Sequence, residues 1–201
     1  MPDTPLTYQQ AMQVIVSKAK ETLSQPLYDS NDIAAATIGD TLYFNANTIG
    51  TVGLLRTNME LQGQLSQPRQ FIAQQLAVVP WPTQAVAAAS ILTTLDASLI
   101  VAQSTITFVI SDKFYLRGPS NLFPGGLGVD GYAAAGAGAA IEAAHSGVAH
   151  PSGRFQLKPG QLIKPTENFN IRLTIPVALA GLTKTTRVYV VLFGLQLRAV
   201  Q

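Results

Sequence analysis

The stretch that decides the predicted fold is Ser104–Arg117, which reads STITFVISDKFYLR. Its apolar residues Ile106, Phe108 and Ile110 recur at every second position, and the alternation resumes after Ser111–Asp112. A period of two places the apolar side chains on one face of a pleated strand. The stretch therefore predicts a half-buried strand that bends, or forms a hairpin, at Ser111–Asp112.

The C-terminal quarter predicts two further strands. Phe169–Ile175 alternates in the same way, which is typical of a strand with one buried face. The last run, Arg187–Val200, is apolar at both odd and even positions. That pattern is typical of a central strand covered on both faces, because an exposed edge strand of this composition would promote aggregation.

Other β-elements are predicted from shorter runs. Thr41–Ala46, Thr51–Leu61 and Gln70–Val79 have strand composition. Strands are also predicted at Arg154–Leu157 and Leu162-Ile163, separated by a turn at Pro159-Gly160. The alanine-rich run Gln84–Leu95 is predicted to be a short helix, and a loop is predicted at Asp96-Ala97.

The N-terminus predicts an amphipathic helix over Thr7–Ser24. Thr7 and Gln10 fit a capping box, and Ala11, Val14, Ile15 and Leu23 form an apolar stripe at helical spacing. Gln25-Pro26 disfavours continuation of the helix. The stripe needs a partner, and the sequence leaves three open: the sheet of its own chain, a neighbouring subunit, or a membrane surface.

These elements predict a mainly β fold, an antiparallel β-sandwich or jelly roll of about eight strands with an N-terminal helix. The sequence does not show the repeated alternation of strands and helices that is typical of a parallel sheet. The chain of 201 residues is predicted to be one domain over residues 1–201. Within it, residues 1–28 form an N-terminal helical arm, and Gly118–His150 is a Gly/Ala-rich loop insertion.

The composition limits the classes of function. Charged residues make up 12% of the chain, about half the usual share, while the net charge is only +2. A charge-poor surface suits a protein covered by neighbours, although an unusual monomer remains the alternative. The basic residues are scattered, so no sequence-specific nucleic-acid binding is expected. Cysteine is absent, which excludes disulfides and thiolate metal sites.

The Gly/Ala-rich loop contains three patterns that are candidate sites. Gly126–Gly131 matches the GxGxxG dinucleotide pattern, but no strand-turn-helix unit surrounds it. From Gly125 the same residues give one copy of a calcium-repeat motif, which needs stacked copies. His145 and His150, with Glu142 nearby, lack the fixed three-ligand geometry of a zinc site. We therefore predict no catalytic, cofactor or metal site, and no enzymatic activity.

Trp81 and four arginines are candidate residues for contacts with a sugar or with another protein chain. Trp81 lies between two prolines and is interpreted either as a plug at a strand end or as an exposed anchor for a sugar or a protein. The arginines lie at or within predicted strands, where they could bind carboxylates of another subunit or lie on solvated faces. They are Arg117, Arg154, Arg172 and Arg187.

The layout resembles the single jelly-roll capsid proteins of tailless icosahedral viruses. The resemblance rests on the helix Thr7–Ser24 and on three stretches. They are NMELQGQLSQPRQFIAQQLAVVP (Asn58–Pro80), STITFVISDKFYLRGPSNLFPGGLG (Ser104–Gly128) and RVYVVLFGLQLRAV (Arg187–Val200). The chain has no marked basic arm, in contrast to capsid proteins that package nucleic acid through such tails.

The resemblance implies a structural virion protein, located in the virion of a virus such as a bacteriophage. Its partners would be other copies of itself in a homo-oligomeric capsomer and the neighbouring capsomers. Some members of the family also contact other capsid proteins or an internal membrane. One alternative is a carbohydrate-binding or adhesive β-sandwich using Trp81, Tyr115 or Tyr132. Another is an enzyme on the same scaffold using His145 or His150.

Overall fold

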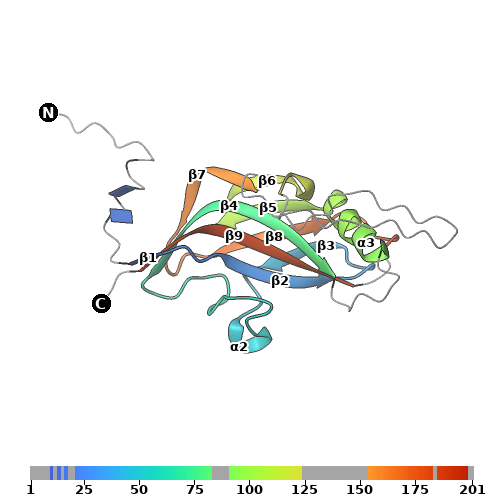
Figure 1. The fold of residues 1–201 in the computed structure, drawn as a ribbon, viewed down its shortest axis with the longest axis horizontal. Coiled ribbons are helices and arrows are strands. Elements are labelled where there is room, and N and C mark those ends of the chain that lie inside the picture. Colours follow the sequence, from blue (N-terminus) through green and yellow to red (C-terminus); the bar gives the residue numbers. More distant parts are fainter. Residues whose placement is uncertain are drawn as a thin grey trace.

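The computed structural model describes residues 10, 13, 14, 16, 17, 21–82, 91–123, 154–182 and 185–198; for residues 81, 82 and 91–95 it describes the backbone alone. Within this part of the chain, nine strands form two antiparallel sheets that pack face to face (Figure 1). The predicted β-sandwich is confirmed, and the fold is mainly β.

Sheet A contains five strands. They are β1 (Glu21–Leu23), β2 (Leu27–Ile33), β4 (Arg69–Pro82), β7 (Phe155–Ile163) and β9 (Thr186–Arg198). Their order is β1-β9-β4-β7. β1 and β2 pair with the same side of β9: β2 pairs with residues 186–192 and β1 with residues 196–198. Sheet B contains four strands in the order β3-β8-β5-β6. They are β3 (Gly39–Tyr43), β5 (Thr105–Ile110), β6 (Lys113–Pro119) and β8 (Phe169–Ile175).

The long pair β4–β9 runs through the middle of sheet A. Its register extends from Arg69 opposite Arg198 to Pro82 opposite Thr186, with a bulge between Ala73 and Gln75. Gly194 lies opposite this bulge, where a Cβ atom would overlap the carbonyl oxygen of Ile72. The close approach of the two backbones therefore requires glycine at this position.

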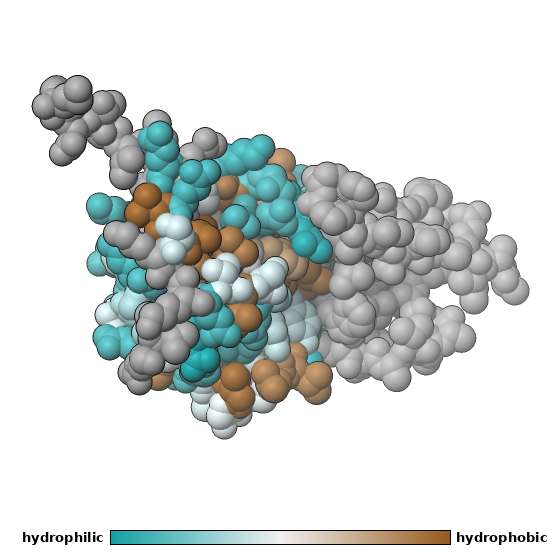
Figure 2. Space-filling view, turned by 60° about the vertical axis from the view of Figure 1, so that its left-hand side comes forward, coloured by the Kyte–Doolittle hydropathy of each residue, from teal (hydrophilic) through white to brown (hydrophobic). Residues whose placement is uncertain are grey.

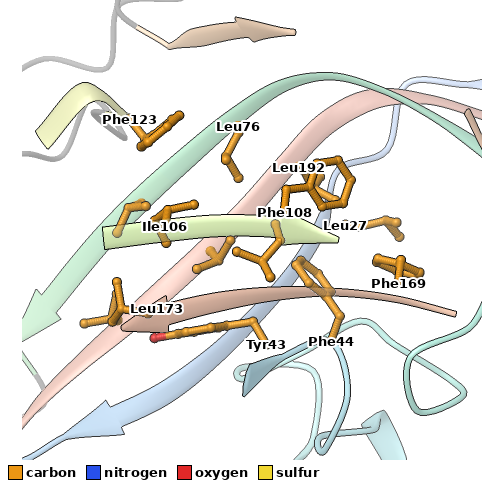
Figure 3. Packing of buried hydrophobic residues seen from close by; sticks show 14 of the residues in the cluster. Leu27, Tyr43, Phe44, Leu76, Ile106, Phe108, Phe123, Phe169, Leu173 and Leu192 are labelled. Carbon is orange, nitrogen blue, oxygen red and sulfur yellow. The ribbon is translucent and has the colours of Figure 1, made fainter. Parts of the chain in front are cut away.

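The core lies between the sheets. Side chains from both inner faces project into the same space and fill it, as Figure 3 shows. Its largest fully buried members are aromatic and aliphatic, and the rings of Phe44 and Phe169 lie 5.5 Å apart. The core also contains Tyr43, Phe71, Phe108, Phe123, Leu76 and Ile106, among others. A close-packed interior of this kind supplies most of the hydrophobic stabilisation of the fold.

The stretch Ser104–Arg117 forms the predicted hairpin. β5 and β6 pair around Ser111 and Asp112, whose φ angles of 45° and 65° are typical of a tight two-residue turn. Ile106, Phe108 and Ile110 are buried, as predicted, but Thr107 and Val109 on the other face are buried as well, so β5 is covered on both faces and is not half-buried. β8 follows its predicted pattern, with every second residue from Phe169 buried.

The last strand is central in its sheet, as predicted, but only one of its two faces is fully covered. β9 pairs with β4 on one side and with β1 and β2 on the other. Val188, Val190 and Leu192 are fully buried, whereas Tyr189 and Val191 on the opposite face are half-buried.

Two predicted strands differ from the structure. Thr51–Leu61 is not a strand: it contains the end of the short helix α2 (Ile49–Val52), followed by turns. Thr48 and Thr51 form a reciprocal capping box there, and Gly53 ends the helix with φ 77°. The β-like composition of this segment was overridden by these local hydrogen bonds. Thr41–Ala46 is a strand only to Tyr43, because Phe44 has a φ of 67°.

The predicted turn at Pro159-Gly160 is wrong, since β7 continues through it. Residues 157–160 lie opposite the bulge of β4 and leave the regular ladder, while both ends of β7 pair with β4. β7 is the edge strand of sheet A, so the missing N–H of Pro159 costs little there.

The helical predictions are corrected in part. Helix α3 covers Ile91–Ala102 and packs against β4 and β9, so Asp96-Ala97 is helix and not loop. Burial of Ala97 and Ile100 against the sandwich explains why the helix continues. Residues 84–90 of the predicted helix lie outside the described residues.

The N-terminal helix, predicted to reach Ser24, ends earlier, because residues 21–23 form β1. Residues 10, 13, 14, 16 and 17 are helical, and the rest of residues 1–20 lies outside the described part. Of the predicted loop insertion, Gly118 and Pro119 belong to β6, and η1 (Ser120–Leu122) follows. Residues 124–150 lie outside the described part.

Candidate assembly surface

The residues singled out as possible catalytic or metal-binding groups lie outside the part of the chain that the structure describes. These are Glu142, His145, His150, Tyr132 and the glycine motif Gly126–Gly131. Among the residues that it does describe, no group of three or more His, Asp or Glu side chains could hold a metal ion. The helices of the described part are all too short or too polar to cross a membrane.

A hollow of about 260 Å³ opens at the end of sheet A where β1 lies; we call it the β1 hollow. The segment of residues 44–66 between β3 and β4 forms one wall, and β1 with the end of β9 forms the other. Its apolar lining consists of Leu23, Leu27, Ile49, Leu54, Met59 and Leu65. Polar and charged side chains complete the lining, so the hollow combines an apolar floor with a polar rim.

The rim of the β1 hollow carries a compact ion-pair network. Glu60 Oε1 accepts from Arg69 Nη1 at 2.6 Å, and Ser66 Oγ donates to Glu60 Oε2 at 2.9 Å. Partial burial acts to raise the pKa of Glu60, but these hydrogen bonds and the charges of Arg69 and Arg198 outweigh it and lower the pKa. Glu60 is thus held as a carboxylate facing two guanidinium groups.

The wall formed by residues 44–66 is fastened to the free edge of β2. Asn58 forms hydrogen bonds with both backbone groups of Tyr28: Tyr28 N donates to Asn58 Oδ1 at 2.9 Å, and Asn58 N donates to Tyr28 O at 3.2 Å. Asn58 Nδ2 also donates to Pro26 O at 2.7 Å. Tyr28 and Tyr189 donate their hydroxyls to the carbonyl oxygens of Leu54 and Leu55. The wall is therefore a fixed part of the fold.

Asp29 anchors the start of the same segment from inside the sandwich. Its fully buried carboxylate accepts from Phe44 N at 2.6 Å, Ser30 N at 2.9 Å and Asn47 Nδ2 at 3.1 Å. Burial raises the pKa of Asp29 and outweighs the hydrogen bonds that favour the charged form. Burial also raises the pKa of Tyr43 well above 10.0, and the negative charges of Asp29 and Asp32 act in the same direction.

Large apolar side chains are exposed at several separate places. Leu54 and Leu55, at the tip of the segment of residues 44–66, are 62% and 84% exposed. Others lie next to β3 and β8, on β6 and in η1: Ile38, Val177, Phe114 and Leu122. Figure 2, turned to bring the β1 end forward, shows hydrophobic patches among polar residues. Exposed apolar residues that occur singly are ordinary on a folded protein, whereas Leu54 and Leu55 are adjacent and Leu54 lines the β1 hollow.

The predicted arginine contacts divide into two kinds. Arg187 pairs with Asp32 at 3.0 Å, and Arg172 lies 4.0 Å from Asp40, so both bind carboxylates of their own chain. Arg117 lies over the ring of Phe114 at 5.0 Å, and Arg154 lies over the ring of Phe193 at 3.8 Å. These two make cation–π contacts within the chain. The side chain of Trp81 lies outside the described part.

The main surface features were not predicted from the sequence. Asp29 and Asn58 act through backbone groups distant in the sequence, so no local spacing reveals them. Leu54-Leu55 was assigned to a strand, although Gly53 just before it was a signal that the chain turns.

Comparison with known proteins found no matching family model, no matching curated protein and no matching solved structure.

Proposed function

We propose that this chain is a structural, non-enzymatic protein that self-assembles into the icosahedral capsid shell of a virus and is located in the virion. The observation that carries the proposal is the order of the strands in the two sheets, which fits a jelly roll. The outer surface supports the same function.

The strand order supports the jelly roll in the following way. Leaving β1 aside, eight strands form two four-stranded sheets, β2-β9-β4-β7 and β3-β8-β5-β6. Along the chain, every connection from β2 to β9 crosses to the other sheet except the β5–β6 hairpin. Eight strands wound in this manner are typical of the jelly rolls of viral capsid proteins, lectins and cupins.

Among capsid proteins, lectins and cupins, the packing and the surface of this chain favour a capsid protein. Large buried side chains fill the space between the described strands, where a cupin would hold its ligand. The chain instead presents exposed leucines beside a hollow and carries few charges, which suits repeated protein–protein contact. The partners would be further copies of the chain in a capsomer and the capsomers around it.

One observation favours a carbohydrate-binding function as the second candidate. Phe114 and Tyr115 are adjacent on β6 and are 62% and 44% exposed, so a sugar ring could stack on them. Glycan-array binding that is lost in a Tyr115→Ala variant would favour this candidate over the capsid.

The proposal is tested by light scattering of the purified chain over a range of protein and salt concentrations, with electron microscopy of the largest species. Capsomer-sized oligomers that grow into closed shells are expected. A monomer at micromolar concentration under every salt condition would overturn the proposal.

A further inference from the structure

The β1 hollow lies directly beside the point where the N-terminal segment joins sheet A. Leu23 belongs to β1 and lines the hollow together with Leu54, and both side chains are partly exposed, at 38% and 62%. An apolar wall left open to water favours an occupant that would cover it.

The N-terminal segment carries an apolar stripe of the kind that fits such a wall. The sequence places Ala11, Val14 and Ile15 on one side of a helix. In the structure Val14 is 38% exposed, and none of the five described residues of this segment is buried. In Figure 1 these helical residues lie beyond β1, away from the two sheets. Val14, the described member of the stripe, is therefore uncovered in a single chain.

We propose that the β1 hollow receives the apolar stripe of the N-terminal segment of a second copy of the chain. This inference rests on the proposed self-assembly and names one of its contacts. β1 runs antiparallel to the end of β9, with Glu21 opposite Arg198, so the segment before Glu21 leaves the sheet at its end. The lining residues Leu23, Gln25 and Leu27 all follow Glu21, so the chain before Glu21 leads away from its own hollow. A neighbouring copy can supply the same stripe from outside, and the exchange repeats from copy to copy.

The absence of cysteine allows a direct test by disulfide cross-linking. Full-length Val14→Cys chains are mixed with larger, tagged Leu54→Cys chains and mildly oxidised. The matched control replaces Leu54→Cys by Val177→Cys, which is 60% exposed and does not line the hollow. A mixed dimer of the Val14→Cys and Leu54→Cys chains is expected on a non-reducing gel, whereas its absence is expected in the control.

Three other outcomes would overturn the inference. A chain carrying both Val14→Cys and Leu54→Cys that closes only an internal disulfide, with no mixed dimers, would mean that each chain fills its own hollow. Equal yields in the test and the control would mean random collision. No link, with the Val14→Cys chain sedimenting with anionic lipid vesicles, would assign the stripe to a membrane surface.

Light scattering of the same samples separates this inference from the proposed function. Shells that form without the specific cross-link would contradict the exchange of the N-terminal segment but not the proposed capsid function. Chains that stay monomeric and are not cross-linked would contradict both proposals.

Discussion

The two open edges of the sandwich are protected in different ways. At the edge formed by β2 and β3, asparagine side chains form hydrogen bonds with backbone groups. Tyr28 N donates to Asn58 Oδ1, Asn47 Nδ2 donates to Ser30 O, and Asn31 Nδ2 donates to Leu42 O. We call this the sealed edge. The sealed edge is completed within the chain, so it contributes to folding and leaves no strand for a neighbour to extend.

The edge formed by β6 is left unsealed. Among the described residues, no backbone bond is made on the side of β6 that faces away from β5. Lys113, Arg117 and Pro119 lie along it, and a bulge at Tyr115 breaks its regular spacing. Charge, proline and bulges are the usual means by which an exposed edge avoids unwanted pairing. Within the described part, the chain therefore protects one edge by hydrogen bonds and the other by charge, proline and a bulge.

The largest effect is expected when the buried anchor of the sealed edge is removed. Asp29→Ala leaves the amides of Phe44 and Ser30 and the side chain of Asn47 without their acceptor in a buried site. We expect the free energy of unfolding to fall by about 3 kcal/mol or more, measured by urea denaturation. Asp29→Asn keeps one acceptor oxygen and should lose less. Equal losses would mean that the shape and the acceptor oxygen that Asn retains contribute nothing, and this would contradict the hydrogen-bonding account.

A smaller effect is expected at the outside of the sealed edge. Asn58→Ala removes the side-chain bonds to Tyr28 N and Pro26 O. Because these groups are only partly buried, water can form some of the lost hydrogen bonds. We therefore expect the free energy of unfolding to fall by about 1–2 kcal/mol. The control is Gln62→Ala, which removes one exposed bond to Ala46 O and should cost below about 0.5 kcal/mol. If both variants lose the same amount, the sealed edge has no special role.

Two carboxylates should give opposite pH dependence. The pKa of Asp29 is raised in the folded chain, so its contribution is fully present below the unfolded pKa, near 3.8, and is lost as pH rises through the folded value. The pKa of Glu60 is lowered, so its contribution is present above about 4.5 and is lost as pH falls through the folded value. Unfolding free energies measured between pH 3 and pH 7 for Asp29→Asn and Glu60→Gln test both signs. Difference curves against the wild type that slope the same way would contradict the assignment.

The smallest effect on folding is expected at the unsealed edge. Phe114 is 62% exposed and contacts Arg117, so Phe114→Ser should change the free energy of unfolding by less than about 0.5 kcal/mol. Light scattering on the same variant would report any effect on assembly separately. A loss above about 1 kcal/mol would mean that this edge belongs to the core of the fold after all.

Sequence reasoning predicted the parts of the fold that repeat a period. The alternation in Phe169–Ile175 predicted a strand with one buried face, and the structure confirms it. Ser104–Arg117 forms the predicted strands and turn, but Val109 is buried as well and Phe114 is 62% exposed, so its burial does not alternate. β9 is central as predicted, although only one of its faces is fully buried. The β7 error at Pro159-Gly160 arose because a proline signals a turn unless the strand is an edge strand opposite a bulge. That context comes from β4, more than eighty residues earlier.

The surface features could not be predicted for a related reason. Asp29 looks like any acidic residue in a polar run until Phe44 and Asn47 fold back onto it. The β1 hollow needs Leu23, Met59 and Gln196, which are brought together only by the completed sheet. The predicted N-terminal stripe was visible in the sequence, but the wall that could receive it was not.

The pairing of β1 with the end of β9 has a practical consequence. Glu21 and Arg198 lie opposite each other, with 3.9 Å between Oε2 and Nη1, so the described chain enters and leaves the sandwich at one place. A short linker should therefore be able to join residues near these positions. New ends opened in the exposed β5–β6 turn at Ser111–Asp112 would then give a circular permutant with the same sheets.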